Sequence, residues 1–146
     1  MGFTRRSTAV WHGTGSEGKG RLTSTSGVLH DTPYSAAARF TGEDGKLGTN
    51  PEELIAAAHA GCFTMALSFR LAGAGFTPSE LSTTAGVSIE KQGDGWSVVG
   101  IALELVGQVP GISAEQFQEI AMAAKEGCPI SRALKAVPIS ITARLV

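Results

Sequence analysis

A long helix with clear start and stop signals is the feature that most constrains this chain of 146 residues. Asn50 is a good N-cap, Pro51 suits the first helical position, and Glu53 stands at capping-box spacing from Asn50. Gly73 is expected to stop the helix soon after Leu71. Apolar side chains wrap around much of this helix, so we expect it to be central to the fold.

Small residues make up much of the same helix, at positions 56, 57, 58, 60, 61 and 66. A helix with so little side-chain bulk can approach another backbone closely. Two explanations stay open at this point: high helix propensity inside an ordinary core, or a buried helix that crosses a partner at a subunit interface.

Outside the long helix, the sequence pattern mostly predicts strands and turns. Alternating apolar and polar residues predict two long strands joined by a glycine-containing hairpin turn at 93–95. Ser113 starts a second helix with a capping box. The expected strands or extended segments are 6–12, 21–25, 34–40, 81–91, 96–106 and 139–145; a turn falls at 42–45; the expected helices are 50–71, 113–127 and 129–136. This order predicts an α+β fold in a single domain, residues 1–146.

The composition argues against a nucleic-acid-binding, secreted or membrane protein. Charged residues make up 17% of the chain and the net charge is −1, so a nucleic-acid partner has no electrostatic support. The start of the chain lacks the apolar core of a secretory signal and no apolar stretch approaches twenty unbroken residues, so we expect a cytoplasmic protein with no membrane partner. In that compartment a cysteine pair is catalytic, redox-sensing or metal-binding more often than a structural disulfide.

Cys62 lies inside the first helix, three residues after His59. This spacing places the two side chains on one helix face, where the imidazole can tune the thiol. The plainer alternatives are that Cys62 is a small core hydrophobe and that His59 bonds a backbone carbonyl.

Cys128 follows Gly127 and precedes Pro129, at the expected start of the last short helix. Free amide groups and the positive end of a helix dipole lower the pKa of a thiol in such a position. Local physics therefore ranks Cys128 as the more readily ionised thiol, whereas Cys62 needs an activating charge from elsewhere.

Arg39 is the candidate for that charge, because a guanidinium stabilises a thiolate and can hold a peroxide oxygen. The alternative is a solvated strand arginine. Glu52 and Glu53 could orient Arg39, although both also suit a helix N-terminus. Helix rise places Glu52 about 15 Å from Cys62, so a helix break or a partner chain must bring Glu52 to the Cys62 site if it serves there.

Two other uses of the cysteines have weaker support. A metal site built from His59, Cys62 and Cys128 lacks a fourth ligand. A Cys–His hydrolase lacks an Asn or Asp motif to orient the histidine, and His59 is fixed on the same helix as Cys62. We therefore expect no metal and no cofactor.

Three runs of sequence resemble the OsmC/Ohr family of thiol peroxidases. They are GTNPEEL at 48–54, AAHAGCF at 57–63 and GCPIS at 127–131, and the similarity extends to 27–29, 33–35 and 109–112. These additional matches make the chain similar to the osmotically inducible protein C subgroup in particular. The glycine-rich stretch 16–20 lacks the arginine that the organic-hydroperoxide-resistance subgroup carries there. By that similarity Arg39 takes the arginine's role.

The resemblance implies an OsmC-like fold, with antiparallel sheets wrapped around two central helices in an intertwined homodimer. It implies that Cys62 is the peroxidatic thiol and Cys128 the resolving thiol, with Arg39 and Glu52 in the site and His59 as a modulator. The implied substrate is an organic hydroperoxide, and the implied reductant is an external dithiol such as a lipoyl-bearing protein. The remaining alternative is an OsmC-fold stress or binding protein without peroxidase activity.

Overall fold

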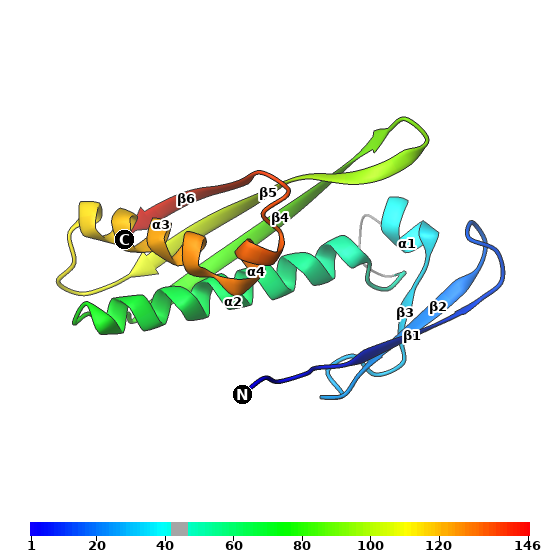
Figure 1. The fold of residues 1–146 in the computed structure, drawn as a ribbon, viewed down its shortest axis with the longest axis horizontal. Coiled ribbons are helices and arrows are strands. Elements are labelled where there is room, and N and C mark those ends of the chain that lie inside the picture. The colour runs from blue at the N-terminus through cyan, green and yellow to red at the C-terminus, as the bar shows by residue number, and fades with distance from the viewer. Residues whose placement is uncertain (42–46) are drawn as a thin grey trace. The chain divides into compact units, whose positions relative to one another are not determined.

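The structure is a computed structural model that describes residues 1–41 and 47–146 (Figure 1). By its internal contacts the chain divides into two units, Met1–Leu54 and Ile55–Val146, which are described separately below. The turn expected at 42–45 lies outside the described residues. The assignment of residues 1–146 to a single domain remains a prediction.

The first unit contains a three-stranded antiparallel sheet, in the order β1 (Ser7–His12), β2 (Lys19–Ser24) and β3 (Thr32–Tyr34). Gly20 sits in the middle of this sheet between Trp11 and Tyr34, whose ring centroids are 5.3 Å apart. A Cβ at position 20 would overlap the Tyr34 ring, so only glycine lets the two aromatic rings close over the strand. The two strands expected near the N-terminus are confirmed.

A short helix, α1 (Ala36–Phe40), replaces most of the extended segment that the sequence predicted at 34–40. Ser35 starts it: the backbone is extended there, and its hydroxyl accepts a hydrogen bond from the amide of Ala38 at 3.0 Å. Three successive alanines then favour a helix, a local signal that the strand assignment underweighted. Arg39 therefore lies on a helix and not on a strand.

The long helix α2 (Pro51–Gly73) has the ends expected from the sequence to within two residues. The Asn50 side chain accepts from the amide of Glu53 at 2.9 Å and caps the helix. The Glu53 carboxylate accepts a hydrogen bond from Thr49 at 2.9 Å. Gly75 adopts a positive φ of 87° just beyond the C-terminus, a conformation that favours glycine.

The second unit contains a sheet of β4 (Glu80–Gln92), β5 (Gly95–Gln108) and β6 (Ile139–Leu145). The first two strands form the predicted hairpin. The third strand, β6, runs parallel to β5, which differs from the expected antiparallel sheets. The reason is the connection: α3 (Ala114–Gly127) and α4 (Pro129–Ala133) carry the chain back along the sheet before β6 begins.

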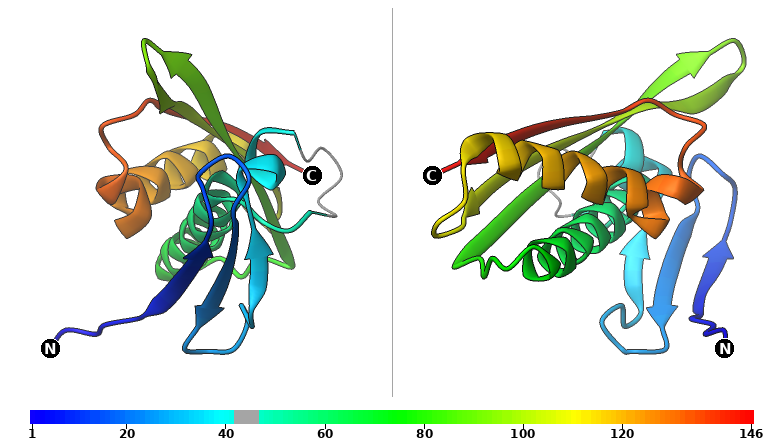
Figure 2. Two further views of the ribbon diagram at one scale, coloured as in Figure 1. Left: turned by 90° about the vertical axis from the view of Figure 1, so that its right-hand side faces the viewer. Right: turned by 60° about the vertical axis from the view of Figure 1, so that its left-hand side comes forward.

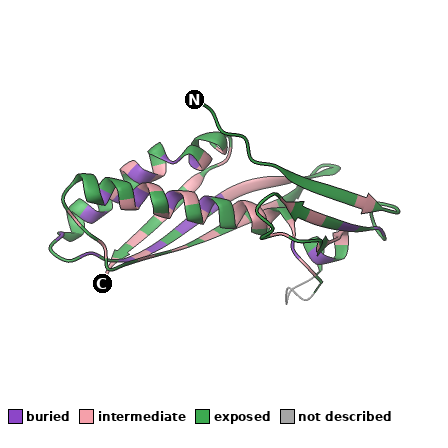
Figure 3. Cartoon of the chain, turned by 90° about the horizontal axis from the view of Figure 1, so that it is seen from below, coloured by how far each residue is buried: buried purple, intermediate pink, exposed green. Residues whose placement is uncertain are grey.

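Helices α2 and α3 lie on the same face of this sheet (Figure 2). The buried residues of α2 recur every fourth position (Figure 3). In the second half of β5 every second residue, from Ile101 to Gly107, is buried, and the residues between are more exposed. The core consists of Phe63, Leu67, Leu71, Ile101, Leu103, Leu105, Val109, Ile112, Phe117, Ala121, Ala124 and Cys128. The α+β fold class is confirmed, and the core holds one of the two cysteines.

Candidate active site

The two cysteines, 66 positions apart in the sequence, come together in the second unit. Cys62 lies in the middle of α2, and Cys128 is the single residue between α3 and α4. Both are free thiols, and each shifts the pKa of the other by hydrogen bonding. The fold thus brings two thiols from distant parts of the sequence next to each other.

Cys128 is fully buried at the N-cap of α4. Burial alone would raise the pKa of its thiol, but polar groups around the sulfur reverse the direction and lower it. These groups are the backbone amides of Ser131 and Ile130, the Cys62 thiol and the Ser131 hydroxyl. The sulfur makes no conventional capping hydrogen bond, so the amides act as longer polar contacts.

Cys62 is only partly buried, and the pKa of its thiol is raised. Burial is the largest cause; the amide of Ile130 opposes it, and the neighbouring Cys128 raises the pKa further. Within the second unit, the more accessible thiol is therefore the less readily ionised one.

His59 is completely buried one turn before Cys62, and its imidazole contacts α4. Its Nε2 lies 2.7 Å from the hydroxyl of Ser131, while its Nδ1 has no hydrogen-bond partner among the described residues. Burial lowers the pKa of His59, so the ring is neutral at neutral pH. The spacing of His59 and Cys62 in the sequence predicts that the imidazole acts on Cys62, whereas in the structure His59 contacts Ser131, which lies next to Cys128.

The described residues do not support a metal site or a Cys–His hydrolase built from His59 and the two cysteines. Across positions 1–41 and 47–146, no group of three or more His, Cys, Asp or Glu side chains is placed to hold a metal ion. Within the same residues His59 has no carboxylate to orient it, as a Cys–His hydrolase would need.

Arg39 and Glu52 form an ion pair within the first unit. The guanidinium donates from Nη2 to Oε1 at 2.6 Å and from Nε to Oε2 at 3.1 Å. The Glu52 side chain is 11% exposed and that of Arg39 is 34% exposed. Two parallel bonds fix the plane of the guanidinium, and this leaves Nη1 as the group that can face a small ligand.

The Arg39 side chain lines an aromatic cavity of about 230 Å³ in the same unit. Trp11, Tyr34 and Phe40 contribute its rings, and the Arg39 guanidinium lies 5.1 Å from the centre of the Phe40 ring. Phe63, the residue after Cys62, does not line this cavity. Phe63 is completely buried in the core of the second unit, so its role is packing.

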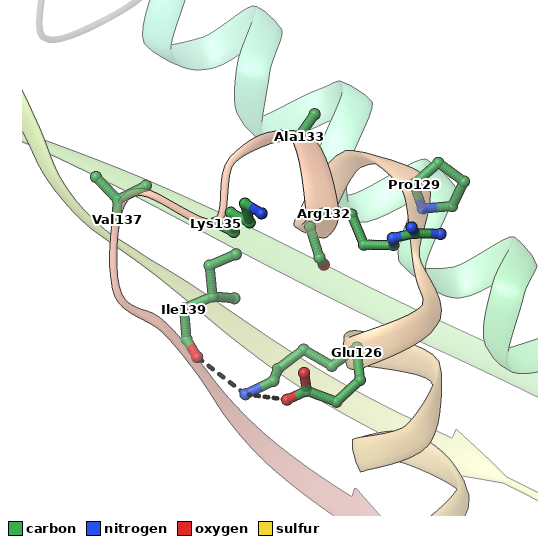
Figure 4. Close-up of a pocket in the computed structure, with 9 residues that line it drawn as sticks. Glu126, Pro129, Arg132, Ala133, Lys135, Val137 and Ile139 are labelled. Carbon is green, nitrogen blue, oxygen red and sulfur yellow. Dashed lines mark hydrogen bonds and ion pairs between the residues drawn. The ribbon is translucent and has the colours of Figure 1, made fainter.

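Another cavity, of about 610 Å³, opens between α3, α4 and the start of β6. Figure 4 shows residues that line it, among them Glu126, Arg132 and Lys135. Lys125 bridges the wall by donating to the carbonyl of Ile139 at 3.2 Å and pairing with Glu126 at 3.4 Å. Ser131 lines the same cavity and is 6% exposed there.

A comparison with protein-family models matches residues 42–142 to the family described as OsmC-like protein. The chain belongs to this family. It is 49% identical over 136 residues to peroxiredoxin OsmC of Escherichia coli (strain K12), with 93% of each chain covered. It is 34% identical over 117 residues to the organic hydroperoxide resistance protein OhrB of Bacillus subtilis (strain 168), with 80% of this chain and 82% of that protein covered.

Solved structures of the OsmC/Ohr group have the same fold. The crystal structure of OhrB from Bacillus subtilis superimposes with a TM-score of 0.70 at 32% identity, over 99% of this chain and 98% of that one. An OsmC-like protein from Mycoplasma pneumoniae reaches a TM-score of 0.77 at 18% identity, which speaks for the fold alone. The family and fold expected from the sequence motifs are confirmed.

Sequence reasoning missed Ser131 as a site residue, although it quoted the GCPIS run that contains it. The available signal was its position three residues after an N-cap cysteine, where helix geometry turns the residue back toward the cap. The aromatic residues near Arg39 were also missed, because Trp11 and Tyr34 meet only through strand pairing.

Proposed function

We propose that this OsmC-family protein is a cysteine-based peroxidase that reduces organic hydroperoxides, with Cys62 as the peroxidatic thiol and Cys128 as the resolving thiol. One observation carries the proposal: two free thiols from distant parts of the chain lie close enough to alter each other's pKa. Relatives named peroxiredoxin and organic hydroperoxide resistance protein support the reaction class.

The reaction follows from thiol chemistry. The Cys62 thiolate attacks one oxygen of the peroxide, the O–O bond breaks, and the second oxygen leaves as an alkoxide that takes a proton and becomes an alcohol. Cys62 is then a sulfenic acid. The Cys128 thiolate attacks this sulfur, a disulfide forms, and the hydroxyl group leaves as water after protonation. An external dithiol restores both thiols by two exchange steps.

The raised pKa of Cys62 requires a positive charge near the thiolate, and Arg39 is our candidate. The ion pair with Glu52 orients the guanidinium, and its Nη1 group is suited to hold a peroxide oxygen. The aromatic rings beside Arg39 favour an organic group on the peroxide over hydrogen peroxide. We expect Arg39 and Glu52 to act on Cys62 in the assembled homodimer, because α2 continues without a break from Pro51 to Gly73.

A homodimer is supported by the outer side of α2. Met65 is 62% exposed and Phe69 is 73% exposed, and both are large apolar side chains. By length and composition alone this helix could also cross a membrane, but the core helices of soluble proteins meet the same criterion. We propose that a second copy covers this side, that the protein acts in the cytoplasm, and that a dithiol, such as that of a lipoyl-bearing protein, is the reductant.

Thiol counting tests the proposal. One equivalent of cumene hydroperoxide added to the reduced protein is expected to remove two thiols per chain and to leave one Cys62–Cys128 disulfide, identified by mass spectrometry of the unreduced peptides. If both thiols stay free after this treatment, the protein is an OsmC-fold binding protein and not a peroxidase.

A further inference from the structure

Cys128 has to lose a proton at a particular moment of the reaction, and its surroundings are dry. While Cys62 is a thiolate, the two neighbouring sulfurs share one proton, since two adjacent negative charges repel. Once Cys62 has become a sulfenic acid its charge is gone and Cys128 keeps the proton. Cys128 must then release that proton to attack, from a fully buried position.

Ser131 is placed to receive this proton. It is the third residue of α4, and Cys128 is the N-cap of the same helix, a spacing that places the Ser131 backbone and hydroxyl against the Cys128 sulfur. The Ser131 hydroxyl also contacts the imidazole of His59 at 2.7 Å. A hydroxyl can accept one proton and donate another at the same time, so it can connect the thiol with the imidazole.

His59 has the properties of the base at the end of this connection. The ring is completely buried, it forms no ion pair in the part of the chain that the structure describes, and it is neutral at neutral pH. A core histidine with a purely structural role normally has both ring nitrogens satisfied, because an unpaired buried polar atom is costly. Here Nε2 faces Ser131 and Nδ1 has no partner among the described residues.

The groups around the connection are charged on one side and apolar on the other. On the side of α3 and α4, three cations and one carboxylate line the cavity that Ser131 reaches: Lys125, Arg132, Lys135 and Glu126. On the sheet side, β5 contributes the buried apolar residues Ile101, Leu103 and Leu105, and β4 packs apolar side chains against them. The cavity is open to solvent. Ser131 lines it, whereas Cys128 and His59 do not.

We propose that Ser131 and His59 form a proton relay that activates Cys128 for disulfide formation, an inference that rests on the proposed peroxidase function. The Cys128 thiol passes its proton to the Ser131 oxygen, and Ser131 passes its own proton to Nε2 of His59. The thiolate then attacks the Cys62 sulfenic acid, the S–O bond breaks, and hydroxide leaves. His59 returns the proton through Ser131 to solvent, where it balances the hydroxide as one molecule of water. Ser131 contacts the reacting sulfur, and His59 is a positioning residue that acts through it.

The test follows one step of the reaction as a function of pH. Reduced protein is mixed with one equivalent of cumene hydroperoxide, and the conversion of the Cys62 sulfenic acid to disulfide is timed by acid quench and mass spectrometry between pH 5 and 9. Ser131→Ala is expected to slow this conversion by about tenfold to a hundredfold and to move its pH midpoint upward, toward the ordinary value of a cysteine thiol. His59→Gln is expected to move the midpoint in the same direction.

Two controls separate the relay from a structural role. Ser131→Thr keeps the hydroxyl and should restore the pH midpoint, and Ser140→Ala removes an exposed hydroxyl elsewhere and should change neither rate nor midpoint. A folded Ser131→Ala protein whose conversion is slower but keeps its midpoint would overturn the relay, and so would an unchanged rate. If the wild-type protein forms no sulfenic acid at all, the peroxidase proposal fails together with the relay.

Discussion

Cys62 and Cys128 lie side by side but in contrasting surroundings. Cys128 is fully buried, yet the start of α4 and the Ser131 hydroxyl lower the pKa of its thiol. Cys62 is only partly buried, yet burial and the neighbouring sulfur raise the pKa of its thiol. The more accessible thiol is therefore the one whose pKa its own unit raises.

This contrast separates two kinds of activation. The pKa of Cys128 is lowered by groups within three residues of it at the start of α4, together with the neighbouring Cys62 thiol. For Cys62 we propose activation by a positive charge that its own unit does not supply, with the Arg39–Glu52 pair as the candidate. Such a dependence would keep the partly buried Cys62 thiol unreactive until the whole site is assembled.

The largest expected effect comes from the outer side of α2. Phe69→Asp introduces a charge where we expect a second copy to bind, so the protein should become a monomer. If Cys62 is activated only in the dimer, peroxide consumption should fall close to the uncatalysed rate. Sedimentation velocity measures the first effect and cumene hydroperoxide consumption the second.

The matched control is Glu104→Gln, an exposed change on the other face of the sheet that should leave both unchanged. A Phe69→Asp protein that stays dimeric or remains fully active would contradict the proposal that the outer side of α2 forms a dimer interface needed for activity.

The second-largest effect is expected from the positive charge of Arg39. Arg39→Ala should raise the pKa of Cys62 further and slow its reaction with peroxide by about tenfold or more, because each unit of thiol pKa corresponds to about 1.4 kcal/mol. Arg39→Lys keeps the charge but loses the paired hydrogen bonds to Glu52, so an intermediate rate is expected.

Titration of the Cys62 thiolate by its ultraviolet absorbance in a Cys128→Ser background gives the pKa directly. An unaltered pKa and rate in Arg39→Ala would make Arg39 a solvated surface residue.

The smallest expected effect is on the stability of the protein, and it comes from His59, which contacts Ser131 next to Cys128. Burial lowers the pKa of His59, so the unfolded chain binds a proton more readily than the folded one below the ordinary value of 6.5. Stability should therefore fall as the pH drops from 6.5 toward the folded pKa, by up to about 1.4 kcal/mol per pH unit. His59→Gln should remove this part of the pH dependence in urea unfolding.

The matched control is His30→Gln, which changes an exposed histidine and should preserve the acid sensitivity. If His59→Gln is as acid-sensitive as the wild-type protein, His59 does not govern the acid response.

Local signals predicted most of the fold. The caps at Asn50 and Ser113 and the alternation in the two long strands gave the main elements close to their observed bounds. The error at α1 arose where an N-cap serine and an alanine run compete with an extended neighbourhood. The parallel partner of β5 was not predicted, because sheet order depends on contacts between distant segments.

The site was predictable only in part, for a similar reason. The two cysteines and Arg39 stand out by residue type and setting, and family resemblance paired the thiols. The contact between His59 and Ser131 joins residues 72 positions apart, and no periodicity or spacing encodes it. Only the packing of α4 against α2 brings that serine to that histidine.

Chemical trapping of the first oxidised cysteine tests most directly the claim that Cys62, despite its raised pKa, is the thiol that peroxide oxidises. Reduced Cys128→Ser and Cys62→Ser proteins are each treated with one equivalent of cumene hydroperoxide in the presence of dimedone, and the labelled peptide is identified by mass spectrometry. The account predicts a dimedone adduct on Cys62 in Cys128→Ser and none in Cys62→Ser. An adduct on Cys128 in Cys62→Ser, with Cys62 unlabelled in Cys128→Ser, would contradict it.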